Sequence, residues 1–127
     1  MKSECRVPKS SILLVDDDPQ IRRLCRITLE MAGFKVFEAD SPTAALAIWE
    51  TESAAIDLLL TDFNMPGMTG LELAKLLHDQ RPSLPVLLIS GCYLGTPPVP
   101  SEICFLEKPF SLPALTAAVR KGLQLGL

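Results

Sequence analysis

The stretch SILLVDDDP, residues 11–19, carries the clearest structural signal in the sequence. Four consecutive apolar residues, Ile12 to Val15, favour a strand that is buried on both faces of a parallel sheet. Three carboxylates, Asp16 to Asp18, follow at once. Like charges repel one another and lose hydration when they are buried, so this arrangement lowers stability. We therefore expect a cation to bind at the end of this strand.

The composition is typical of one small globular domain. The 127 residues suffice for a packed core, and 48% of them are hydrophobic, which excludes a disordered chain. A net charge of −3 provides no basic surface for nucleic acid or an anionic membrane. The leader MKSECRVPKS lacks the apolar segment of a signal peptide, and no apolar run is long enough to span a membrane. We expect a cytoplasmic protein that binds neither nucleic acid nor membranes.

Four scattered cysteines give no sign of a zinc site or a redox dithiol. They are Cys5, Cys25, Cys92 and Cys104, and no two of them form a C-x-x-C pair. Both kinds of site depend on such paired spacing. We expect reduced thiols that behave as small apolar residues.

Buried-strand patterns alternate with helical patterns along the chain. The expected strands cover residues 12–15, 35–38, 56–61, 86–89 and 103–106. Helices are predicted to begin at Asp18-Pro19 and Ser41-Pro42, where a capping residue precedes proline, and Ser111 is expected to cap the last helix. This alternation, with its short connections, predicts an α/β fold with a parallel sheet and helices on both faces.

Residues 91–102, GCYLGTPPVPSE, interrupt the alternation where a helix is due. Pro97, Pro98 and Pro100 each remove a backbone donor and bias the preceding residue away from helical angles. Only about one helical turn fits, near Cys92. We expect the helix between the fourth and fifth strands to be shortened or missing. The irregular connection would expose apolar surface on the neighbouring strands, which favours binding of a partner protein or formation of a homodimer.

Reactive side chains stand at the ends of the predicted strands. The first strand ends in Asp16 and Asp17, the third in Asp62 and the fourth in Ser90, and Lys108 follows the fifth. The carboxyl ends of parallel strands meet at one edge of a sheet, where ligands bind. Clustered carboxylates suit Mg²⁺, and a carboxylate can attack phosphorus to give an aspartyl phosphate. A lysine and a hydroxyl would then contact the phosphoryl oxygens.

These motifs resemble the receiver domain of bacterial two-component response regulators. The matching segments are ILLVDDDP, TDFNMPGMTG, VLLISG and FLEKPF. The resemblance covers residues 11–123 and leaves 1–10 and 124–127 as tails. It implies a flavodoxin-like, doubly wound sheet of five parallel strands in the order 2-1-3-4-5.

The resemblance also implies a role for each acidic residue. Asp62 would be the phosphoacceptor. Asp17 and Asp62 would bind Mg²⁺ through their side chains, and Asn64 would bind it through its backbone carbonyl. Asp16 would hold the ion through a water molecule.

The remaining matches imply how the phosphoryl group is bound and sensed. Ser90 and Lys108 would contact the phosphoryl group as catalytic residues, and the Lys108-Pro109 peptide is expected to be cis. Phe105 stands at the position of the aromatic switch residue, which turns inward when the residue matching Ser90 moves toward the phosphate. Because Phe105 has no hydroxyl, it cannot make a hydroxyl-mediated contact with an output partner.

The implied function is a signalling domain rather than an enzyme, since it catalyses only its own phosphorylation and dephosphorylation. It would accept a phosphoryl group from a sensor histidine kinase or a histidine phosphotransfer protein. The change in conformation would then be read by a downstream protein whose identity the sequence does not give.

Two alternative functions stay open. A degenerate receiver could act as a constitutive interaction module, which the altered residues 91–102 keep in consideration. Asp16-x-Asp18 also matches the nucleophile motif of haloacid dehalogenase-like phosphatases, although Gln20 stands where that family expects Thr or Val. Local alternatives are a helix cap for Asp18 and simple core packing for Phe105.

Overall fold

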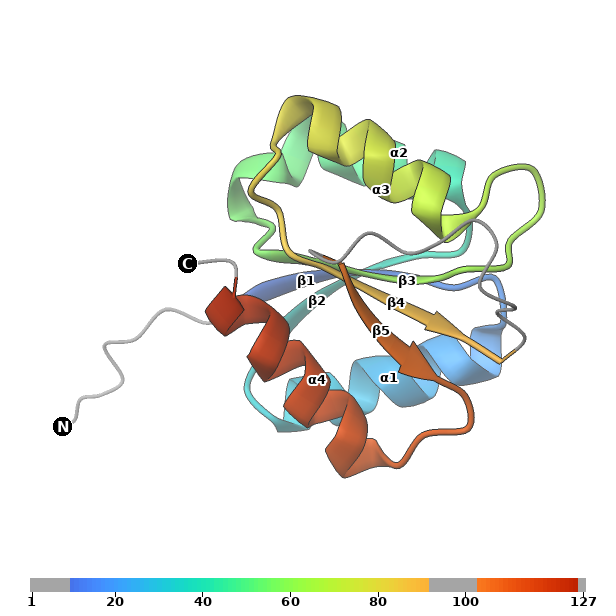
Figure 1. Ribbon diagram of the computed structural model, residues 1–127, viewed down its shortest axis with the longest axis vertical. Coiled ribbons are helices and arrows are strands. Elements are labelled where there is room, and N and C mark those ends of the chain that lie inside the picture. The colour runs from blue at the N-terminus through green and yellow to red at the C-terminus, as the bar shows by residue number, and fades with distance from the viewer. Residues whose placement is uncertain (1–9, 92–102, 126–127) are drawn as a thin grey trace, which may run out of the picture.

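The computed structural model describes residues 10–91 and 103–125. They form a five-stranded parallel sheet in the order β2-β1-β3-β4-β5, which confirms the predicted topology (Figure 1). The strands are β1 Ser11–Val15, β2 Lys35–Ala39, β3 Leu58–Asp62, β4 Val86–Ser90 and β5 Cys104–Glu107. The expected short or missing helix between β4 and β5 lies outside the described residues.

Helices cover both faces of the sheet (Figure 1). The helices are α1 Pro19–Met31, α2 Pro42–Glu52, α3 Gly70–Gln80 and α4 Leu112–Leu125, and the short 3₁₀ helix η1 spans Ser53–Ala55. Helices α2 and α3 lie on one face, and α1 and α4 lie on the other. Within the described ranges, no helix is both long and apolar enough to cross a membrane.

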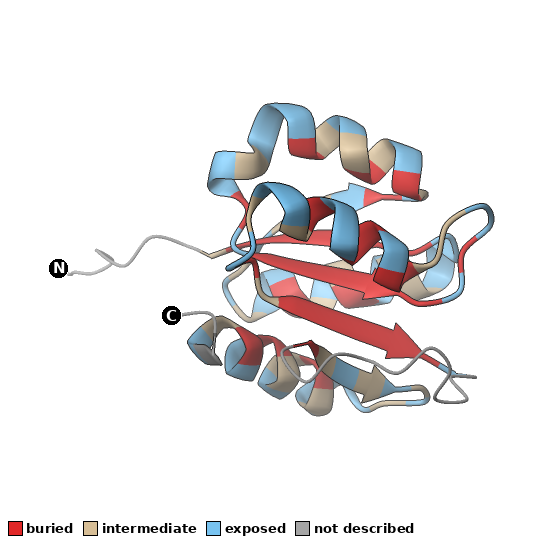
Figure 2. Cartoon of the chain, turned by 45° about the horizontal axis from the view of Figure 1, so that its top comes forward, coloured by how far each residue is buried: buried red, intermediate tan, exposed pale blue. Residues whose placement is uncertain are grey.

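The sheet is the middle of three layers, which explains its apolar strands. Every residue of β1, β3 and β4 is buried (Figure 2). In β1, Leu13 and Val15 face the core under α2 and α3, whereas Ile12 and Leu14 face the core under α1 and α4. An unbroken apolar run is therefore needed, because both faces of this strand are covered.

Capping residues begin the helices as the sequence predicts. The Asp18 side chain accepts hydrogen bonds from the backbone N–H groups of Gln20 at 2.9 Å and Ile21 at 3.4 Å. The Ser41 hydroxyl accepts one from Ala44 N–H at 3.1 Å, and Pro19 and Pro42 occupy the first helical positions. Helix α3 is opened by a capping box, in which Thr69 and Glu72 each bond the other's backbone. These caps fix where each helix leaves the carboxyl edge of the sheet.

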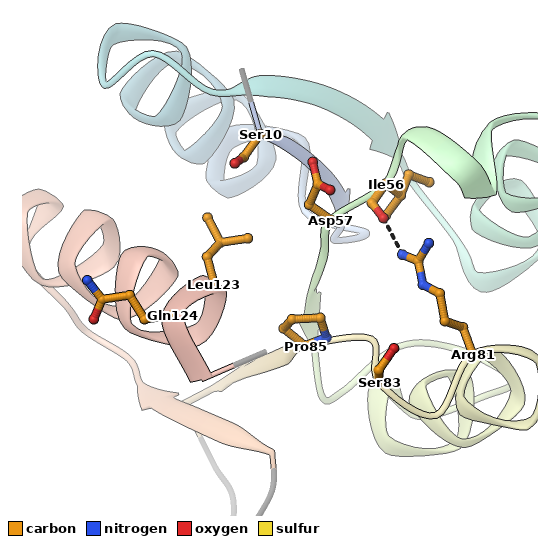
Figure 3. Close-up of a pocket in the computed structure, with 8 residues that line it drawn as sticks. All are labelled: Ser10, Ile56, Asp57, Arg81, Ser83, Pro85, Leu123 and Gln124. Carbon is orange, nitrogen blue, oxygen red and sulfur yellow. Dashed lines mark hydrogen bonds between the residues drawn. The ribbon is translucent and has the colours of Figure 1, made fainter. Parts of the chain in front are cut away.

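A pocket of about 430 Å³ lies at the opposite edge, where the strands begin (Figure 3). Its lining residues are Ser10, Ile56, Asp57, Arg81, Ser83, Pro85, Leu123 and Gln124. The two charged side chains that line it are hydrogen-bonded to backbone groups. Arg81 donates to the carbonyls of Ser53 and Ile56, and Asp57 Oδ2 accepts the Ser11 N–H at 2.8 Å. These bonds tie the loops at the amino ends of the strands together.

Candidate functional site

Strand register brings the predicted site residues to one level of the sheet. Val15 pairs with Thr61, so Asp16 and Asp62 follow side by side. Asp62 pairs with Ile89, which places Ser90 one step beyond it on β4. Ser90 in turn pairs with Glu107, and Lys108 follows directly. Four parallel strands thus deliver these side chains to a single edge.

Three carboxylates form the centre of the site. Asp16, Asp17 and Asp62 each offer an oxygen, and these oxygens all lie within 4.8 Å of one another. Asp16 and Asp62 are buried, whereas Asp17 is exposed. Asp16 Oδ1 accepts the Asp18 N–H at 2.9 Å, but Asp16 Oδ2 is buried and has no hydrogen-bond partner within the described part of the chain. An unsatisfied buried carboxylate oxygen beside two others fits the oxygen ligand set of a hard divalent cation.

One lysine reaches into this acidic cluster. Lys108 Nζ lies 3.3 Å from Asp62 Oδ1 and 3.8 Å from Asp16 Oδ2. Its backbone N–H donates to the Ser90 carbonyl at 2.8 Å, which anchors the end of β5 against β4. The Lys108-Pro109 peptide is cis, as expected. Among the ion pairs of the described residues, one ammonium therefore opposes this group of three carboxylates.

Burial makes ionisation of the carboxyl groups in this cluster unfavourable. Loss of solvent raises the pKa of Asp16, and the nearby charge of Asp62 raises it further, against the opposing effects of the Asp18 N–H and Lys108. Loss of solvent likewise raises the pKa of Asp62, although the Lys108 ammonium opposes the shift. A bound divalent cation would favour the ionised carboxylates, which are the forms that can coordinate metal or attack phosphorus.

A hydroxyl and an amide complete the edge beside Asp62. Ser90 is fully buried, and its Oγ accepts a hydrogen bond from Asn64 Nδ2 at 3.4 Å. Asn64 is exposed in the loop after β3, where Gly67 adopts a φ of +87° that L side chains rarely take. The loop therefore places Asn64 over the end of β4, with its side chain toward the buried hydroxyl.

Two further assignments concern Asp18 and Phe105. Asp18 caps α1 through its side chain, so the second aspartate of the Asp16-x-Asp18 motif already has a structural role. Phe105 lies on β5 opposite Leu88 and is 38% exposed, which argues against simple core packing. Its role as a switch stays a prediction.

Gly70 and Arg22 also shape the site, and neither belongs to the predicted set. A methyl group on Gly70 would lie 2.2 Å from the Asp62 carbonyl oxygen, so only glycine permits this approach of α3 to the strand end. Arg22 Nη1 donates to the Asp16 carbonyl oxygen at 2.7 Å. The sequence signals these two contacts only weakly. Gly70 is a glycine at the start of a helix, and Arg22 is an arginine one turn inside α1.

Comparison with known proteins identifies the family. A family model described as the response regulator receiver domain matches residues 12–94. The C4-dicarboxylate transport transcriptional regulatory protein DctD of Pseudomonas aeruginosa is 37% identical over 126 residues, which cover 91% of this chain and 26% of that protein. Sensor kinase CckA of Brucella abortus is 31% identical over 119 residues, covering 91% of this chain and 13% of that protein.

Solved structures agree with the sequence comparison. The receiver domain of the hybrid histidine kinase CckA has a TM-score of 0.78 and 33% identity, covering 91% of this chain and all of that one. A response regulator receiver protein from Sinorhizobium medicae has a TM-score of 0.83 and 30% identity, covering 94% of this chain and 98% of that one. The chain belongs to the receiver domain family of two-component signalling systems. Receiver domains bind Mg²⁺ at an acidic cluster, and Asp16, Asp17 and Asp62 form such a cluster.

Proposed function

We propose that this domain accepts a phosphoryl group on Asp62. One observation supports this choice above the others: the Lys108 ammonium lies 3.3 Å from Asp62 Oδ1, beside the unsatisfied Asp16 Oδ2. Of the three clustered carboxylates, Asp62 lies closest to the Lys108 ammonium, which can bind incoming phosphoryl oxygens. Asp16 and Asp17 offer oxygens within 4.8 Å of an Asp62 oxygen and would complete the ligand set.

The transfer is a displacement at phosphorus. A lone pair of the Asp62 carboxylate forms the new O–P bond as the bond between phosphorus and the donor nitrogen breaks, and the donor imidazole leaves with that electron pair. Lys108 moves its ion pair from the carboxylate to a phosphoryl oxygen, and the Ser90 hydroxyl donates to another. Asp17, Asp62 and the Asn64 carbonyl would bind Mg²⁺ directly and Asp16 would hold it through water, and the ion would supply charge neutralisation for the phosphoryl oxygens.

The donor of the phosphoryl group and the downstream partner are inferred from membership of the receiver domain family. A phosphohistidine on a sensor histidine kinase or a phosphotransfer protein supplies the phosphoryl group, and hydrolysis later removes it. Relatives include both a transcriptional regulatory protein and a sensor kinase. The output is a change in conformation that involves Ser90 and Phe105 and is recognised by a downstream protein.

Phosphorylation by a small donor tests the proposal directly. The protein is incubated with acetyl phosphate and Mg²⁺, and its intact mass is measured. We expect one phosphoryl group, dependent on Mg²⁺ and removed by hydroxylamine, as an acyl phosphate requires. Asp62→Asn should abolish this adduct while keeping the fold, whereas Asp79→Asn, which removes an exposed carboxylate on α3, should not. A hydroxylamine-stable adduct, or one that persists in Asp62→Asn, would refute the assignment.

A further inference from the structure

Arg22 bonds the peptide unit between the first two aspartates of the site. Its Nη1 donates to the Asp16 carbonyl oxygen at 2.7 Å, and only 19% of the side chain is exposed. That carbonyl belongs to the planar peptide linking Asp16 to Asp17. Fixing the carbonyl fixes the peptide plane, and with it the position of the Asp17 Cα from which the exposed side chain projects.

Asp16 is otherwise held at every polar atom except one. Its N–H donates to the Ala39 carbonyl at 3.2 Å, and its Oδ1 accepts the Asp18 N–H at 2.9 Å. Only Oδ2 has no hydrogen-bond partner in the described part of the chain, and its contact there is the longer 3.8 Å ion pair with Lys108 Nζ. The bond from Arg22 therefore completes a frame that leaves one oxygen of Asp16 for the shared cluster.

A chain of ion pairs holds Arg22 in place. Arg22 Nε lies 3.4 Å from Oε1 of Glu38 on β2, and Arg26 Nε lies 2.8 Å from Oε2 of the same carboxylate. Arg26 Nη1 also pairs with Glu30 at 3.0 Å. The Arg22 guanidinium thus contacts two acceptors, the Asp16 carbonyl and the Glu38 carboxylate, which lie in different parts of the fold. The fork geometry of arginine permits this double contact, and a lysine ammonium does not reproduce it.

We propose that Arg22 is a positioning residue for divalent-cation binding, and that Glu38 acts with it by holding the guanidinium against the Asp16–Asp17 peptide. The inference rests on the metal site of the proposed function. Positioning and simple electrostatics predict opposite effects of mutation on the affinity for the cation. Removing a positive charge near a cation site should strengthen cation binding by electrostatics alone, whereas loss of positioning should weaken it.

Titration of Mg²⁺ into the metal-free protein, followed by calorimetry or NMR, tests the sign. We expect Arg22→Gln to raise the Kd for Mg²⁺ about tenfold, in line with the loss of other groups that orient metal ligands. Arg22→Lys should recover part of that loss. Arg23→Gln, which removes the same charge from the exposed neighbouring residue, should leave the Kd unchanged or lower it.

Coupling to Glu38 is tested by a double-mutant cycle. Glu38→Gln should raise the Kd for Mg²⁺ by a smaller factor, and the double variant Arg22→Gln/Glu38→Gln should bind no worse than Arg22→Gln alone. Phosphorylation by acetyl phosphate should need more Mg²⁺ for half-saturation in Arg22→Gln but reach the same plateau rate. A Kd for Mg²⁺ that is unchanged or lowered in Arg22→Gln overturns the inference, even if the melting temperature falls. If the effects of Arg22→Gln and Glu38→Gln on the Kd add in the double variant, the part played by Glu38 is overturned. Absence of Mg²⁺ binding in the wild type would instead refute the proposed function.

Discussion

Gly70 lets α3 begin against the end of β3, the strand that carries the proposed phosphoacceptor Asp62, and replacing it should disturb both stability and phosphorylation. A methyl group in Gly70→Ala would lie 2.2 Å from the Asp62 carbonyl oxygen, 3.0 Å from its carbonyl carbon and 3.1 Å from Leu88 Cδ2. Ordinary contact begins at 3.4 Å, so the separation must grow by 1.2 Å, which is 3.4 minus 2.2. Two of the three obstructing atoms are backbone, which cannot rotate aside.

The expected loss is about 2–3 kcal/mol of the free energy of unfolding. Overpacking costs roughly 1–3 kcal/mol. The Gly70 N–H bond to the Phe63 carbonyl, 2.8 Å long, contributes about 1 kcal/mol more if it is lost. The better helix propensity of alanine offsets up to about 1 kcal/mol. For a domain of this size the melting temperature should fall by about 10 °C.

Thermal and urea unfolding of Gly70→Ala measure this loss, with Gly91→Ala as the matched control. A methyl group on Gly91 would lie 3.6 Å from Lys108 Cβ, which is ordinary contact, so this control should melt close to the wild type. Because the displaced carbonyl belongs to Asp62, Gly70→Ala should also slow formation of the acyl phosphate at saturating Mg²⁺. Equal melting of the two variants, within 2 °C of each other (about 0.5 kcal/mol), would show that the steric argument is wrong.

Three other perturbations probe the charges of the molecule. Mg²⁺ at ten times its Kd should stabilise the fold by about 1.4 kcal/mol, more than NaCl of equal ionic strength, and Asp17→Ala should abolish the difference. Burial raises the pKa of Asp16 above the ordinary 3.8, so the metal-free folded state binds this proton more tightly than the unfolded chain. The ionised Asp16 therefore lowers the free energy of unfolding fully above its raised pKa and not at all below 3.8. Asp16→Asn should melt at a higher temperature than the wild type at neutral pH, and this difference in melting temperature, the gap between the two proteins, should close on acidification. A gap that widens at low pH would contradict this sign. At the opposite edge, Arg81→Ala removes bonds to two backbone carbonyls and a cation lying 5.0 Å from the Trp49 ring, so unfolding in urea followed by Trp49 fluorescence should show a loss of about 2–4 kcal/mol.

The sheet and the placement of most candidate site residues could be predicted because local patterns specify them. An apolar run such as Ile12 to Val15 can be satisfied only between two covering layers, and the residue that follows each parallel strand must lie at the common edge. Caps at Asp18 and Ser41 are equally local, since each side chain bonds a backbone group two or three residues ahead.

Contacts that depend on the path of a loop could not be predicted in this way. The bond from Arg22 to the Asp16 carbonyl needs the turn between β1 and α1 to fold back along the helix, which no periodic pattern specifies. The approach of Gly70 to Asp62 depends on a distance between two elements. An apolar side chain in a helix is also no guarantee of burial, since Leu24 and Leu76 are 46% and 40% exposed although Cys25 and Leu77 beside them are buried.

The site is assembled from strands that are made at very different times during synthesis. Asp16 and Asp17 come early in the chain, yet Lys108 is delivered only when β5 has paired with β4 along the whole register from Leu87 to Ser90. A nascent chain that ends before β5 would hold the acidic cluster without its counter-ion. On the proposed function, efficient phosphorylation of Asp62 would therefore require the entire sheet, so a chain that ends before β5 would compete poorly with the finished domain for a phosphoryl donor.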